Sequence, residues 1–117
     1  MNHKDLEVWK GSMALAKEIY LLTNVFPKEE IYGITSQIRR ASVSVPSNIA
    51  EGAARNSDKE LIQFLYISLG SMSEVETQLL LSYDLGFLKD LDILPKIEKI
   101  KKQLLALIKY LKNKSTK

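Results

Sequence analysis

Basic side chains are the residues of this sequence whose type and spacing could bind a ligand. Arg39 and Arg40 stand side by side in segment 34–55, where apolar residues recur at helical spacing. Their planar guanidinium groups suit a bidentate partner, which is either a carboxylate such as Glu51 or a phosphate. We favour the ion pair, inside one subunit or between two, because it is the commoner use of a half-buried arginine. Arg55, near the end of the segment, is a further candidate for nucleic-acid contact.

A second basic group lies near the end of the chain, on one side of an expected helix. The opposite side carries a regular apolar seam, so these lysines should face away from the core. They could contact phosphates, which supply sequence-independent and salt-dependent affinity. The alternative is a solvated helix face, which we favour for a single helix. Repetition around an oligomer changes this weighing, because multivalency amplifies weak contacts. The nucleic-acid candidates of this helix are Lys96, Lys99, Lys102, Lys109 and Lys112.

The sequence offers little material for catalysis. His3 is the only histidine and there is no cysteine, so histidine-based acid–base catalysis, a thiolate zinc site and a cysteine nucleophile lack residues. No Glu-x-x-His pair of the di-iron type and no Walker-type glycine loop occurs. We therefore expect a protein that is not an enzyme and that uses no metal and no cofactor.

Length and charge limit the class of protein. The 117 residues, with a formal net charge of +3, suffice for one domain over 1–117. Residues 57–87 hold one lysine and five acids, whereas residues 88–117 hold nine lysines and three acids. The basic end could meet nucleic acid, an anionic membrane surface or the acidic segment of a neighbouring subunit. No stretch approaches the ~18 apolar residues that span a bilayer, and the first ten residues lack a signal-peptide pattern, so we expect a soluble cytoplasmic protein without a membrane partner.

Apolar periodicity predicts an all-α fold with four helices. Pro46 lies in the middle of the second helix, where it lacks a backbone donor and should kink the chain. The small residues around it favour close approach of another helix. The expected helices cover residues 5–24, 29–55, 58–85 and 91–113.

Capping residues support the predicted helix ends. Ser57 followed by Glu60 has the form of a capping box before the third helix. Gly86 suits the left-handed conformation that ends a helix, after which the chain can fold back over the last turn. The first and fourth helices should be capped by aspartates, Asp5 and either Asp90 or Asp92.

Surplus apolar surface predicts an oligomer. The first half of the third helix is apolar on most sides, which is expected only where several helices surround it. A single four-helix monomer buries about one face of each helix, so the remainder is available to other subunits. The candidate subunit-interface residues are Trp9, Arg39, Arg40, Glu51, Phe64 and Ile67.

Some blocks of the chain form a distinctive set: Asp5–Lys10, Phe26–Gly33, Gln37–Ala41, Val45–Gly52 and Phe64–Leu65 through Gly70–Ser71. These blocks resemble one known family, the four-helix-bundle proteins encoded in intervening sequences of bacterial 23S ribosomal RNA genes. The resemblance implies an antiparallel up-and-down four-helix bundle, assembled as a ring-like homopentamer without known enzymatic activity. Relatives of that family include the accessory variability protein of diversity-generating retroelements, which works with a reverse transcriptase and has a basic nucleic-acid-binding surface.

Two functions follow from these observations. The first is a non-enzymatic oligomeric bundle that binds structured RNA or DNA through repeated basic patches. A reverse transcriptase is an expected partner if the chain is encoded in a retroelement. The alternative is a protein-interaction scaffold or adaptor without a nucleic-acid role, in which the arginines serve subunit packing.

Overall fold

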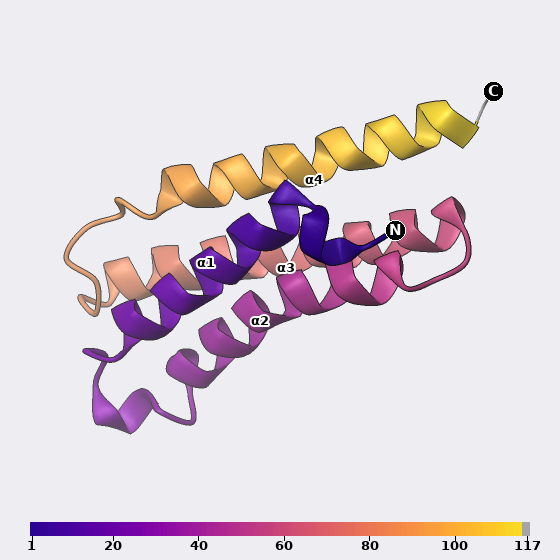
Figure 1. The fold of residues 1–117 in the computed structure, drawn as a ribbon. Helices are drawn as coiled ribbons and strands as arrows, with labels where there is room; N and C mark the ends of the chain where they lie inside the picture. Colours follow the sequence, from indigo (N-terminus) through magenta and orange to yellow (C-terminus); the bar gives the residue numbers. More distant parts are fainter. Residues whose placement is uncertain (116–117) are drawn as a thin grey trace.

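The computed structural model describes residues 1–115, the side chain of Ser115 excepted. Four long helices dominate the described chain, and it contains no strand. Figure 1 shows them side by side in an elongated bundle, with successive helices running in opposite directions. The last two residues of the expected domain, 116–117, lie outside the described part. The elements are η1 (His3–Asp5), α1 (Glu7–Thr23), η2 (Lys28–Glu30), α2 (Ile34–Ala53), α3 (Asp58–Asp84) and α4 (Leu94–Ser115).

The helices pack in an up-and-down order. Each packs against its neighbour along the chain and α4 returns to α1, while the diagonal pairs α1–α3 and α2–α4 make no close backbone contact within residues 1–115. The bundle measures 51 × 22 × 19 Å. The α2–α3 pair is the most extensive contact and α1–α4 the least extensive. These observations confirm the all-α, antiparallel four-helix bundle.

Close packing of α2 on α3 follows from small residues. A Cβ atom on Gly52 would lie 2.7 Å from Phe64 Cβ, so glycine lets the two helices touch there. The Ser68 hydroxyl is fully buried and donates a hydrogen bond to Val45 O at 2.8 Å. Small hydroxyl-bearing side chains therefore fasten these two helices while they bring the backbones close.

The core is formed by apolar residues that recur at helical spacing along the four long helices. Ile38 of α2, Leu65 of α3 and Leu104 of α4 are all completely buried. Burial on this scale is the main source of stability in a domain of this size. The other fully buried apolar residues of the described chain are Ile19, Val45, Ile49, Met72, Val75, Leu79, Ile97 and Leu111.

Both ends of α3 form as predicted. Ser57 Oγ accepts a hydrogen bond from Glu60 N at 3.2 Å, and its hydroxyl contacts the Glu60 carboxylate at 3.2 Å. At the other end Gly86 has φ +84°. Phe87 N donates to Ser82 O at 2.9 Å, which is the hydrogen bond of a Schellman ending.

The other three helices begin later than predicted. Asp5 is not the N-cap of α1, because it lies in η1 and Leu6 precedes the helix. The second helix begins at Ile34, since residues 28–30 form a separate 3-10 turn before Gly33. The fourth begins at Leu94, beyond both candidate aspartates. Asp90 Oδ1 accepts from the backbone N of Asp92 at 3.1 Å, so it stabilises a turn before the helix.

Pro46 is buried inside α2, and the helix continues on both sides of it. The proline therefore does not break the helix. Two serines of α2 near the proline are hydrogen-bonded. Ser42 Oγ donates to Arg39 O at 2.8 Å, and Ser44 Oγ lies 2.9 Å from Ser71 Oγ of α3. The kink near Pro46 stays a prediction.

Candidate nucleic-acid interface

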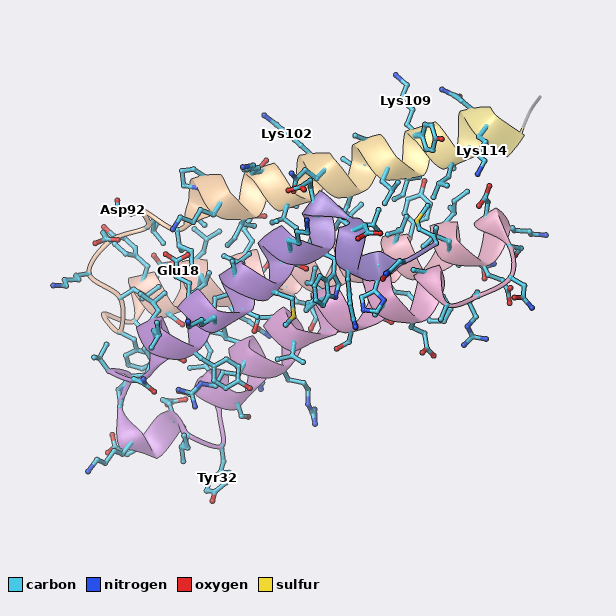
Figure 2. All side chains as sticks on the ribbon, in the orientation of Figure 1. Glu18, Tyr32, Asp92, Lys102, Lys109 and Lys114 are labelled. Carbon is cyan, nitrogen blue, oxygen red and sulfur yellow. The ribbon has the colours of Figure 1, made fainter. Side chains whose placement is uncertain are left out.

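Three lysines of α4 form an exposed basic line. Lys99, Lys102 and Lys109 have no ion-pair or hydrogen-bond partner within residues 1–115. Figure 2 shows Lys102 and Lys109 projecting outward from the helix, away from the other three helices. Because α4 buries its apolar seam on the opposite side, the lysine ammonium groups stand in solvent. We call these three residues the α4 lysine line.

Two other lysine candidates of α4 contact neighbouring helices. Lys96 Nζ pairs with Glu18 Oε1 of α1 at 2.7 Å. Lys112 Nζ lies 2.8 Å from the Tyr66 hydroxyl of α3 and 5.1 Å from the centre of that ring. Both lysines are exposed, but they also hold α4 against the bundle.

Two of the five acids of α3 pair with lysines of α4 within the same chain. Lys101 Nζ lies 3.0 Å from Glu76 Oε1 and 3.5 Å from Glu98 Oε1. Lys114 Nζ lies 3.4 Å from Asp58 Oδ2. The hydrogen bond that Lys101 Nζ donates to the Glu76 carboxylate raises the pKa of Lys101, against the opposing effect of its burial. Sequence reasoning missed Lys101, which stands next to the buried Ile100 and so beside the seam.

Arg39 is held by the end of α1. Its Nε donates to Thr23 Oγ1 at 2.9 Å, and its Nη2 donates to Asn24 Oδ1 at 3.0 Å and to Tyr20 O at 3.3 Å. The guanidinium group also lies 4.8 Å from the centre of the Tyr20 ring. α1 has no basic residue in its own last turn, so Arg39 supplies the positive charge that favours a helix C-terminus.

Glu51 pairs with Arg55 rather than with Arg39. Arg55 Nη2 lies 3.1 Å from Glu51 Oε1, one helical turn earlier. The same guanidinium group lies 5.0 Å from the centre of the Phe64 ring. The structure thus brings three candidate residues together at the α2–α3 connection. Phe64 is half-buried under this arginine.

Arg40 is exposed beside two grooves. On one side it lines a polar groove of about 370 Å³ between α2 and α3, together with Gln37 and Glu74. On the other side it lies near Ile31 and Val43. The Arg40 guanidinium has no partner within the described residues, so of the arginine candidates it is the one most available to a ligand.

Trp9 and Ile67 mark two different apolar surfaces. Trp9 is half-buried and lines a groove of about 470 Å³ between α1 and α2, with Met13 and Val43. The His3 ring packs on Trp9 in an edge arrangement, with centroids 5.0 Å apart. Ile67 lies on α3 and is 50% exposed. The interface candidates therefore do not form one patch on a single chain.

Residues 1–115 contain no group of three or more His, Cys, Asp or Glu side chains that could hold a metal ion. None of the described helices combines the length and apolar character needed to cross a membrane.

Comparison with known proteins assigns the family. No curated protein matches the sequence. The family described as 23S rRNA-intervening sequence protein matches residues 4–112, which is nearly the whole chain, and the four-helix bundle agrees with this match. The chain belongs to the 23S rRNA-intervening sequence protein family.

Proposed function

We propose that this protein is a non-enzymatic oligomer that binds structured RNA or DNA through repeated copies of its basic surface. The α4 lysine line carries the proposal, because Lys99, Lys102 and Lys109 are exposed and lack acid partners within residues 1–115. Phosphate groups are the natural partners of such a line, since they need charge and no particular base sequence. Arg40 extends the cationic surface to another face of each subunit.

Oligomerisation would raise the affinity for nucleic acid above that of a single chain. Lysine contacts from a single chain give affinity that salt removes easily. A homopentamer in a bacterial cytoplasm would present five copies of the α4 lysine line, and binding of one copy raises the effective concentration of the others. This arrangement suits an extended or folded nucleic acid better than a short oligonucleotide.

The test is binding to a structured ribosomal RNA fragment and to duplex DNA across a salt series, with native mass measured on the same samples. Charge reversal at Lys99, Lys102 and Lys109 should remove affinity while the oligomer stays intact. Each lost phosphate contact should reduce the salt slope by about 1. The matched control reverses three other exposed lysines, Lys28, Lys59 and Lys89. Equal loss in the control, or no binding at low salt by an intact wild-type oligomer, would refute the proposal.

A protein-interaction scaffold is the second candidate, supported by the apolar groove between α1 and α2. Met13 is 47% exposed and Val43 is 42% exposed on opposite walls of this groove. Glutamate at both positions should split the oligomer if subunits use the groove, and native mass would show it. An intact assembly would make the groove available to another protein. A reverse transcriptase encoded beside the gene would be the partner to test.

A further inference from the structure

A groove between α1 and α4 has the size of a small-molecule site. Its volume is about 530 Å³, and the walls include Ala14 and Leu15 of α1 and Ile100 of α4. Ligand pockets in proteins commonly occupy about 300–1,000 Å³ and have mostly apolar walls. In Figure 1 α4 lies alongside α1, and this is the least extensive contact between neighbouring helices of the bundle.

The groove has a polar group in its floor. A Cβ atom on Gly11 would lie 2.8 Å from Ile100 Cδ1, so glycine lets the Ile100 side chain pack against α1 there. It would lie 3.8 Å from Gln103 Oε1. This amide oxygen is buried and accepts no hydrogen bond within residues 1–115. Buried acceptors are nearly always hydrogen-bonded. The Gln103 side chain lines the groove and is only partly buried, so rotation of its terminal amide would bring Oε1 to an N–H or O–H group of a ligand.

The mouth of the groove is positively charged. Its two acids are already engaged, Glu18 with Lys96 at 2.7 Å and Glu7 with Lys10 at 3.5 Å. Two exposed lysines remain, Lys17 from α1 and Lys99 from α4, and neither has a partner within the described residues. Cations on both helices at one opening would favour a negatively charged group.

We propose that this groove binds a small amphipathic anion. The apolar body lies between Ala14 and Ile100, its N–H or O–H donor bonds to Gln103 Oε1, and its negative group lies between Lys17 and Lys99. This inference goes beyond the proposed nucleic-acid function and shares only Lys99 with it. A nucleic-acid backbone would use the exposed lysines but would leave the apolar walls empty.

The probe for this site is 1-anilinonaphthalene-8-sulfonate, which carries an apolar ring system, one N–H donor and one sulfonate. Titration of the full chain should give a saturable fluorescence rise with one site per chain. Lys17→Ala and Lys99→Ala should each weaken binding about two- to fivefold, as expected for exposed charge pairs. Ala14→Trp should abolish saturable binding, because Ala14 is exposed at the wall and the indole would fill the groove.

Matched variants separate this site from other surfaces. Lys59→Ala and Lys89→Ala remove exposed lysines elsewhere, and Asn56→Trp adds an indole at an exposed turn, so all three should bind the probe normally. Helical circular dichroism and native mass confirm that each variant is folded and assembled. The absence of saturable binding to the wild type, or unchanged binding after both Ala14→Trp and Lys17→Ala, would overturn the proposal. Lys17→Ala and Ala14→Trp leave Lys99, Lys102 and Lys109 unchanged. Loss of probe binding in these two variants is therefore independent of whether the protein binds nucleic acid.

Discussion

Gly52→Ala should destabilise the bundle, because it adds a methyl group where α2 and α3 touch. The new Cβ would lie 2.7 Å from Phe64 Cβ and 3.0 Å from Leu61 Cδ1. Carbon atoms in good contact lie about 3.5–4.0 Å apart. Phe64 Cβ is attached directly to the backbone, so rotation of its side chain cannot relieve the contact and the helices must separate locally.

The expected size of the effect is a balance of two terms. Overpacking of a core costs about 1–3 kcal/mol, while alanine gains about 0.5–1 kcal/mol over glycine inside a helix. The difference between the two terms spans about 0–2.5 kcal/mol. Because rotation of the Phe64 side chain cannot relieve the contact, we expect a loss of about 1–2 kcal/mol in the free energy of unfolding. For a domain of this size the melting temperature should fall by about 4 °C or more.

Gly70→Ala is the matched control, because nothing lies within 4 Å of the Cβ position at this α3 glycine. Alanine should stabilise the chain there by about 0.5–1 kcal/mol. Thermal and urea unfolding of both variants at one protein concentration would compare them, with native mass recorded, since assembly itself adds stability. Changes of the same sign in both variants, at unchanged native mass, would refute the reasoning.

Three further predictions concern polar contacts. Arg39→Ala should lower the free energy of unfolding by about 1–2 kcal/mol, because the end of α1 loses the hydrogen bonds from this arginine. If urea unfolding gives the same free energy for the variant and the wild type, Arg39 does not stabilise the end of α1. Ser68→Ala should cost about 1 kcal/mol through loss of the buried bond to Val45 O, whereas a stability equal to wild type would show that this bond contributes nothing. Because folding raises the pKa of Lys101, its charged form should stabilise the fold fully at a pH below 10.5, the ordinary pKa of lysine. This stabilisation should disappear as the pH rises through the pKa of Lys101 in the folded state. A Lys101→Met variant should therefore lose less stability than wild type above pH 10.5, and parallel pH profiles would exclude the effect.

Helix ends could be predicted where the signal is local. Ser57 with Glu60 marks the start of α3, and Gly86 marks its end, because capping depends on residues within one turn of each other. The start of α2 depends on more distant residues. Glu30 Oε1 accepts from Ile34 N at 3.3 Å, so an acid expected inside the helix instead bonds to its first residue from the preceding turn.

The partners of the arginines could not be read from spacing alone. Arg39 reaches Thr23 and Asn24, which lie in another helix end, and that contact depends on how α1 and α2 are aligned. Glu51 was considered as an ion-pair partner of Arg39 because both residues belong to α2. They lie about three turns apart, however, whereas Arg55 lies one turn from Glu51 and pairs with it. The lack of a basic residue in the last turn of α1 was the one sequence signal for a cation supplied from elsewhere.

The charges of α3 and α4 pair within one chain in the structure, whereas the sequence suggested that they attract neighbouring subunits. Taken as segments, an acidic α3 and a basic α4 suggest attraction between neighbouring subunits. The structure instead pairs Glu76 with Lys101 and Asp58 with Lys114 inside one chain. These pairs engage two of the five acids of α3, and they leave the α4 lysine line without an acid partner within residues 1–115. The charge of this line is therefore available to an external polyanion, and its reversal should abolish nucleic-acid binding but leave a protein-interaction scaffold working.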